Sequence, residues 1–234
     1  MNCERLKPAT RNLQPVTLMI KAFIFDLDGV IVDTAKYHFS AWRRMANELG
    51  FDFTEKENEQ LKGVSRVDSI NLILGWGGKT LSEADKVKWA AQKNEWYLAY
   101  LNQMTPAEIL PGVLPLLKDL RKKGYKIALG SSSKNAERAL RKVRIFSYFN
   151  TIIDGTKTTR SKPDPQVFQM GAQRLGLQPA ECIVFEDAES GVEAALAGGF
   201  YIVGMGSPKN LGKANVVYSS LEGKTIEAII RDVQ

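Results

Sequence analysis

The chain has 234 residues, 44% of them hydrophobic and 25% charged, and its formal net charge is +6. This length suits one domain, or one domain with an insertion, and it allows a sizeable core without metal or disulfide cross-links. No apolar run reaches transmembrane length, Cys3 and Cys182 form no metal-binding spacing, and His38 is the only histidine. We therefore expect a cytoplasmic protein without a disulfide framework, and the positive charge suggests a phosphate or a nucleic acid as partner.

The first eighteen residues have two prolines, mixed polarity and no apolar segment typical of a secretory signal. We predict that residues 1–18 are a flexible N-terminal extension, or that Met19 is the natural start. The alternative is a strand or helix that packs on the core.

The chain from residue 21 begins with a short apolar strand, 21–25 (KAFIF), followed by helical periodicity over 34–49. Residues 55–75 and 82–104 have the pattern of further amphipathic helices, with GWGGK as the break between them. Because no strand pattern occurs between about 35 and 105, we predict a helical segment inserted directly after the first strand.

The second half alternates between strand and helix patterns. Strands are predicted at 126–130, 151–154, 181–187, 201–205 and 216–219, and helices at 114–123, 133–143, 165–175 and 190–197. This alternation with apolar strands indicates a Rossmann-like α/β fold, in which a parallel sheet is covered on both faces. Sites in such folds lie at the carboxyl ends of the strands.

Acidic side chains end two of these strands. Asp26 and Asp28 follow the first strand, and Glu186 and Asp187 end the fourth. On adjacent strand ends these carboxylates repel one another unless a cation lies between them, and oxygen ligands without thiolates suit Mg²⁺. A spare carboxylate can form an aspartyl-phosphate, and a second acid can move the proton of an alcohol. The alternative is a pair of solvated strand ends.

A second polar set suits a phosphate. Residues 131–135 (SSSKN) follow the second strand and open a helix, where hydroxyl and N–H groups favour an anion. The alternative, an N-cap by Ser132 or Ser133, is compatible with anion binding. Lys162 lies between Ser161 and Pro163 and can supply a fixed positive charge, although a solvated loop lysine is the more frequent case.

In this order, DLDGVIVDT, SSSKN, SKPDP and ED followed by SG resemble the four motifs of the haloacid-dehalogenase superfamily. The helical insertion after the first motif resembles the cap of that superfamily, and the match runs from residue 19 to near residue 220. The resemblance implies a parallel-sheet core domain formed by 19–33 and 106–234, with a helical cap domain at 34–105.

Within the superfamily, residues 28–42, 61–66 and 131–135 look like those of enzymes that move a phosphoryl group between the 1- and 6-oxygens of a hexose. The implied reaction is Mg²⁺-dependent and interconverts β-D-glucose 1-phosphate and glucose 6-phosphate through β-glucose 1,6-bisphosphate. The alternatives are a sugar-phosphate phosphatase, a nucleic-acid-binding protein and an inactive binding module.

The resemblance also assigns roles in the core. Asp26 matches the nucleophile and Asp28 the general acid/base, while Ser131 and Lys162 match the groups that hold the transferring phosphoryl. The implied magnesium ligands are Asp26, Asp28 through its backbone carbonyl, Glu186 and Asp187.

Further roles concern the substrate. Arg66 matches a grip on the distal phosphate, and Thr34 and His38 match residues that position Asp28. The implied substrate-binding residues are Lys62, Gly63, Val64, Arg66, Lys93, Ser131, Ser133, Lys134 and Asn135. From the residues alone, packing is the more frequent role for a lone histidine such as His38. Trp42 can pack in the cap core or line the cleft, and packing is favoured. Ala188 departs from the pattern, because serine is common there; we expect a modest effect on the metal.

The basic excess lies mainly in residues 111–160, with 12 basic against 3 acidic side chains. The runs RKKGYK and KNAERALRKVR have little aromatic interleaving, which argues against single-stranded nucleic acid. We therefore expect no nucleic-acid or membrane partner, a hexose phosphate as ligand, and a monomer as the simplest assembly.

Overall fold

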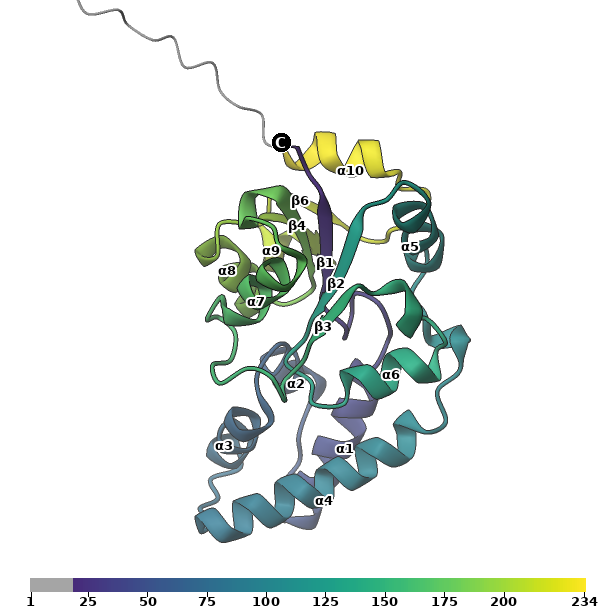
Figure 1. Ribbon diagram of the computed structural model, residues 1–234. Coiled ribbons are helices and arrows are strands. Elements are labelled where there is room, and N and C mark those ends of the chain that lie inside the picture. Colours follow the sequence, from purple (N-terminus) through teal and green to yellow (C-terminus); the bar gives the residue numbers. More distant parts are fainter. Residues whose placement is uncertain (1–18) are drawn as a thin grey trace, which may run out of the picture.

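The computed structural model describes residues 19–234 (Figure 1). The expectation for residues 1–18 lies outside this part. The helical cap, defined here as the segment that carries α1–α4, lies beyond one end of the sheet, and α10 lies at the opposite end.

A six-stranded parallel sheet forms the core, in the order β3-β2-β1-β4-β5-β6. The predicted parallel α/β sheet is thereby confirmed, and the two acid-bearing strands β1 and β4 are neighbours. The strands are β1 (Ala22–Phe25), β2 (Lys126–Gly130), β3 (Thr151–Ile153), β4 (Cys182–Glu186), β5 (Tyr201–Met205) and β6 (Val216–Tyr218).

Helices cover both faces of the sheet (Figure 1), which explains why β1 is apolar at every position. Phe23 and Phe25 pack on the side of α5 (Val113–Lys122), α6 (Ala136–Lys142) and α10 (Ile226–Val233). Ala22 and Ile24 face α7 (Gln166–Leu175), α8 (Glu189–Ala197) and α9 (Pro208–Leu211). Alternate side chains of a strand point to opposite faces, so a strand with two covered faces buries all of them. Short 3₁₀ turns occupy Pro106–Glu108, Phe146–Tyr148 and Pro179–Glu181.

The cap consists of α1 (Ala35–Glu48), α2 (Glu55–Glu59), α3 (Arg66–Trp76) and α4 (Glu83–Leu101). It buries an apolar cluster of its own around Trp42, Met45, Phe53, Ile70 and Ile73. This separate cluster agrees with a cap at 34–105, while the domain boundaries themselves stay a prediction.

Two sequence predictions need correction, and one amphipathic helix was missed. The single helix predicted at 55–75 is wrong, because the chain turns at residues 60–65 and α3 starts anew with Ser65 as its N-cap. At Gly63 φ is +73°, a left-handed conformation that interrupts a helix. Neither Ser132 nor Ser133 caps α6, since Asn135 stands at that position without a side-chain cap. The amphipathic helix α10 was not predicted at all.

Among residues 19–234, no helix combines the length and the apolar character that crossing a membrane would need.

Candidate active site

One pocket lies between the cap and the carboxyl ends of the strands, and both parts of the chain line it. The core contributes Asp26 and Asp28 after β1, residues 131–135 after β2 and Asp187 after β4. The cap contributes His38, residues 61–67 and three side chains of α4: Lys93, Asn94 and Tyr97. The acidic and serine segments, far apart in sequence, therefore share one cleft.

The acidic cluster lies at the bottom of this cleft. Asp26, Glu186 and Asp187 each offer a carboxylate oxygen within 4.8 Å of the others. The buried ammonium of Lys162 lies 2.5 Å from Asp26 Oδ1 and 2.9 Å from Glu186 Oε2. Lys162 is thus a fixed positive charge against the carboxylates, and the solvated-loop alternative is wrong for it.

The electrostatics of the cluster favour a further cation. Burial and the neighbouring Asp26 raise the pKa of Asp187 to about 7, and burial raises the pKa of Glu186 well above its usual range. Burial alone would lower the pKa of Lys162, but its attraction to Asp26 and Glu186 outweighs burial and raises it.

The charge balance of the acidic cluster indicates what it could bind. The cluster has four carboxylates, Asp28 included. Among the described residues, the ammonium groups of Lys162 and Lys62 lie within ion-pair distance of them, and Lys93 attracts Asp28 from farther away. The carboxylates outnumber these ammonium groups, and the donors that they offer are all oxygens. The residues present therefore fit a divalent hard cation.

Asp28 is oriented by three contacts. Its backbone N–H donates to Asp26 Oδ2 at 2.9 Å, and the hydroxyl of buried Thr34 donates to Asp28 Oδ1. His38 Nε2 lies 4.0 Å from that same oxygen. Burial, followed by repulsion from Asp26, raises the pKa of Asp28 to about 6. A carboxyl with such a pKa can both accept and release a proton near neutral pH.

His38 and Lys93 form a buried pair beside Asp28, with 2.9 Å between Nδ1 and Nζ. Burial and the mutual repulsion of the two groups lower the pKa of His38, and burial and Arg66 lower the pKa of Lys93. When Lys93 donates to Nδ1, the proton of the neutral imidazole sits on Nε2, toward Asp28. Nε2 has no hydrogen-bond partner within the described chain. Packing alone does not account for this residue.

The serine loop is organised by its own hydroxyls. Buried Ser131 accepts from Ser133 N at 3.1 Å through its Oγ, and Ser133 Oγ accepts from Asn135 N at 3.2 Å. These bonds curl residues 131–135 around the cleft before α6 begins.

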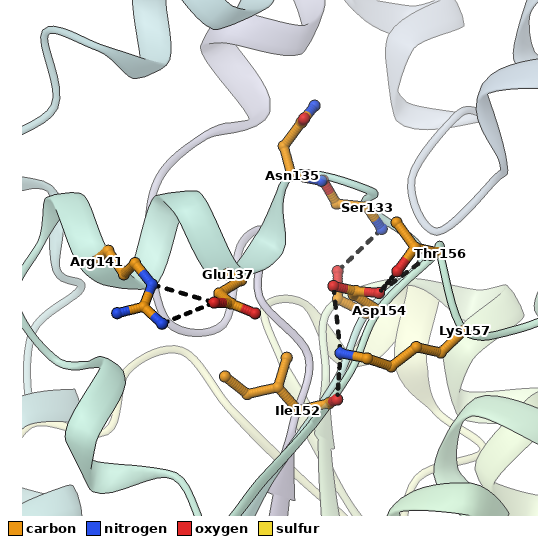
Figure 2. A network of polar contacts seen from close by, with 9 residues as sticks. Ser133, Asn135, Glu137, Arg141, Ile152, Asp154, Thr156 and Lys157 are labelled. Carbon is orange, nitrogen blue, oxygen red and sulfur yellow. Dashed lines mark hydrogen bonds and ion pairs between the residues drawn. The ribbon is translucent and has the colours of Figure 1, made fainter.

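A turn after β3 supports that loop from behind (Figure 2). Asp154 Oδ1 accepts from the N–H of Thr156 at 3.1 Å and from its hydroxyl at 2.5 Å, and Lys157 Nζ lies 3.7 Å from Asp154 Oδ2. The turn brings Gly155 so close that a Cβ there would lie 2.2 Å from the carbonyl oxygen of Ser132. A side chain at position 155 would therefore displace the serine loop.

Arg66 forms the opposite end of the cleft. Its Nη2 donates to Asn94 Oδ1 at 2.7 Å, and the amide of Asn135 donates to the same oxygen at 2.9 Å. Asn94 on α4 thereby joins a cap cation to the serine loop of the core.

Comparison with known proteins agrees with this arrangement. A family model described as haloacid dehalogenase-like hydrolase matches residues 20–199. The chain belongs to this family.

Several family members are similar over nearly their whole length. The beta-phosphoglucomutase of Bacillus subtilis is 40% identical over 212 residues, which is 90% of this chain and 94% of that protein. The structure of beta-phosphoglucomutase from Clostridium difficile superposes with a TM-score of 0.89 at 43% identity, covering 92% of this chain and 97% of that one. A phosphorylated carbohydrates phosphatase of Thermotoga maritima is 31% identical over 201 residues, 83% of this chain and 89% of that protein.

The cleft of this family member gathers the side chains that the sequence singled out. Thr34, Lys162 and Glu186 do not line the pocket but are buried beside it. Thr34 contacts Asp28, Lys162 contacts Asp26, and Glu186 contacts Lys162. Those that line it are Asp26, Asp28, His38, Lys62, Gly63, Val64, Arg66, Lys93, Ser131, Ser133, Lys134, Asn135 and Asp187.

Several lining residues escaped the sequence analysis, and two of them contact residues that it did name. Tyr97 follows Lys93 by four residues on α4, so helical spacing could have revealed it, and its ring lies 4.1 Å from that of His38. Asn94 had no such signal, because its importance comes from two partners distant in sequence. Trp42 does both of the things considered for it, since it packs in the cap cluster and also lines the pocket. The ammonium of Lys93 lies 4.2 Å from its ring centre.

Proposed function

We propose that this chain interconverts β-D-glucose 1-phosphate and glucose 6-phosphate through a phosphorylated Asp26 and β-glucose 1,6-bisphosphate. The observation that carries the proposal is one cleft with polar and cationic groups from both the core and the cap. Asp26 and Ser131 line it, and the buried Lys162 ammonium beside it lies 2.5 Å from Asp26. Arg66 and Asn135 line it as well and share the acceptor Asn94. We assign the first set to the transferring phosphoryl group and the second to the distal phosphate. An enzyme that only hydrolyses a phosphate ester needs the first phosphate-binding set, whereas an enzyme that holds a bisphosphate needs both.

The first transfer uses Asp26 and Asp28 together. The 6-hydroxyl of the sugar attacks the phosphoryl group on Asp26, the new O6–P bond forms and the bond from phosphorus to the Asp26 carboxylate breaks. The hydroxyl proton passes to the Asp28 carboxylate, which Thr34 and His38 hold in place. Lys162 stabilises the carboxylate that leaves.

The bisphosphate then turns over in the cleft. The Asp26 carboxylate attacks the phosphorus on O1, the O1–P bond breaks and O1 takes the proton that Asp28 holds. Arg66 and Asn135 grip whichever phosphate is not reacting. Glucose 6-phosphate leaves, and Asp26 is phosphorylated again.

In this proposal the metal is Mg²⁺, held by Asp26, Glu186, Asp187 and the backbone carbonyl of Asp28, and it would offset negative charge on the transferring phosphoryl group. A divalent cation suits a cluster whose donors are all carboxylate and carbonyl oxygens.

The test supplies β-glucose 1-phosphate with a trace of the bisphosphate and Mg²⁺, and measures glucose 6-phosphate and free phosphate. We expect glucose 6-phosphate as the main product, and we expect Asp26→Asn to abolish turnover while the circular dichroism spectrum stays native. Retained activity in Asp26→Asn would contradict the nucleophile assignment.

The second candidate is a sugar-phosphate phosphatase, which the similarity to the Thermotoga maritima phosphatase keeps open. It uses the same core with water as the acceptor. Free phosphate with little glucose 6-phosphate in the same assay would favour it.

A further inference from the structure

Two core hydroxyls hold the backbone of the cap loop that covers the cleft. Ser132 Oγ donates to the carbonyl oxygen of Gly63 at 3.0 Å, and Ser190 Oγ donates to that of Lys62 at 3.3 Å. Ser132 follows β2 and Ser190 belongs to α8, so the donors come from two separate parts of the core.

The loop lies flat on the core at this point. A Cβ on Gly63 would lie 2.6 Å from Ser190 Oγ and 3.4 Å from the Cβ of Ala188. The small side chain of Ala188 thus gives the loop room to approach. Ala188 stands where the family motif often has serine, and the hydroxyl of this segment is that of Ser190, two positions later in α8, which donates to the cap loop.

The same loop covers the nucleophile. A Cβ on Gly63 would lie 3.7 Å from the side-chain carbon Cδ of Lys162, and the Lys162 ammonium is 2.5 Å from Asp26. Lys62 reaches over the acidic cluster, with 3.5 Å between its Nζ and Asp187 Oδ2. Lifting this loop would expose Lys162, and the Asp26 carboxylate that it pairs with, to water.

We propose that Ser132 and Ser190 are positioning residues that latch residues 62–64 onto the core and thereby set how phosphorylated Asp26 divides between the sugar hydroxyl and water. The inference rests on the proposed function. Both hydrogen bonds exist only while the loop lies on the core, so they favour the closed state over the open one. Neither hydroxyl touches the reacting atoms.

The expected shift between the closed and open loop depends on the net free energy of each hydrogen bond that is removed. In the open state the hydroxyls and carbonyls bond to water, so each latch bond contributes its net value only. Removing one hydroxyl is expected to shift the balance toward the open state about two- to tenfold. The two bonds hold adjacent carbonyls of one loop, so their effects are expected to couple rather than add.

The first experiment compares Ser132→Ala, Ser190→Ala and the double variant with the wild type. Each receives β-glucose 1-phosphate, a trace of the bisphosphate and Mg²⁺, and free phosphate is measured per glucose 6-phosphate formed. We expect this ratio to rise about two- to tenfold in each single variant and further in the double variant. Ser190→Thr, which retains a hydroxyl, should return the ratio toward the wild-type value.

Ser220→Ala is the matched control, because its hydroxyl also donates to a backbone carbonyl, that of Pro111 at 3.5 Å, but lies outside the cleft. It should leave the ratio unchanged. An unchanged ratio in the double variant, or a rise of equal size in Ser220→Ala, would overturn the role in partition.

A second measurement needs no turnover. Hydrogen–deuterium exchange over residues 60–66 should be faster in the double variant than in the wild type and Ser220→Ala. Unchanged exchange would overturn the latch itself. If the wild type released only free phosphate, the proposed function would fail, and the exchange result would still decide whether the latch exists.

Discussion

The pKa of Asp28 shows how strongly the cleft changes the protonation of its side chains. Burial and the neighbouring Asp26 raise its pKa from 3.8 to about 6, although Thr34, Lys162 and Lys93 act in the opposite direction. The folded protein therefore pays in stability for a proton carrier that works near neutral pH. The sequence indicated that acids meet here, but the pKa depends on the distances between them.

The first prediction concerns this cost. In the absence of divalent metal, Asp28→Asn should raise the free energy of unfolding at pH 7 by about 1–3 kcal/mol, because it removes a buried, repelled charge. Between pH 3.8 and about 6 the folded state binds more protons than the unfolded one, so wild-type stability falls as pH rises and the difference grows over that interval.

Urea unfolding in EDTA at several pH values measures this difference. Asp119→Asn on α5 is the control, because Asp119 is exposed. Millimolar Mg²⁺ should shrink the difference. An Asp28→Asn variant that is less stable than the wild type at pH 7 in EDTA would refute the electrostatic account.

At the scale of elements, α4 carries much of the cap side of the cleft. Its middle supplies Lys93, Asn94 and Tyr97. Its C-terminal end is held by α6, since Arg138 Nη2 donates to Asn102 Oδ1 at 2.6 Å and Lys142 Nζ donates to the Asn102 carbonyl oxygen at 2.9 Å. A basic core helix thus grips the negative end of a cap helix.

Asn94 provides the prediction for this element. Asn94→Ala removes the common acceptor of Arg66 and Asn135 and leaves the guanidinium without its orientation. We expect kcat/KM for β-glucose 1-phosphate to fall about 10- to 100-fold, since one of the two bonds involves a charged group. Steady-state kinetics check this.

Asn71→Ala on the exposed side of α3 is the matched control, with an expected change below about twofold. Equal kinetics for Asn94→Ala and the wild type would show that Asn94 does not orient the grip.

Sequence patterns predicted some of the helices and strands but not others. Buried strands such as β1 and β4 were predicted well, because a strand covered on both faces is apolar throughout. The helix predicted at 55–75 was wrong, since the apolar spacing continues across a turn at residues 60–65, where Gly63 is left-handed and Ser65 caps a new helix. The α10 helix was missed, although its N-cap Thr225 is a recognisable start signal.

For the whole molecule, the net charge of +6 divides into a few cleft cations and a larger surface excess. Part of that excess is paired, as with Lys123, whose Nζ lies 2.5 Å from Glu227 Oε1. The cleft cations Lys162, Lys62 and Arg66 are buried or half-buried and face carboxylates or the pocket. Cations in such a cleft act on a bound phosphate far more strongly than solvated ones.

The prediction at this scale compares a cation of the cleft with cations on the surface. Arg66→Ala should lower kcat/KM for β-glucose 1-phosphate about 10- to 100-fold, because it removes a charged contact to the distal phosphate. The double charge reversal Arg121→Glu/Lys122→Glu on exposed α5 should change kcat/KM less than about twofold at 0.15 M salt. Kinetics at two salt concentrations test both, and a larger loss in the α5 variant than in Arg66→Ala would place the important charge on the surface.

Several whole-molecule expectations stay predictions: the monomer, the cytoplasmic location and the absence of a nucleic-acid partner. Fluorescence anisotropy with labelled single-stranded DNA tests the last one. We expect no binding at 0.15 M salt, and salt-dependent binding at that ionic strength would contradict it.

The sequence by itself determined the α/β sheet, the helical segment between the first two strands and the four motif segments, because each depends on local periodicity or on a short run of residues. It did not determine which of those segments touch. The contacts that build the site join residues between 24 and 136 positions apart. They are those of Asn94 with Arg66 and Asn135, of Lys162 with Asp26 and Glu186, and of two core serines with the carbonyls of the cap loop. Such contacts form only when the parallel sheet brings its carboxyl ends together and the cap folds over them, so the tertiary structure decided them.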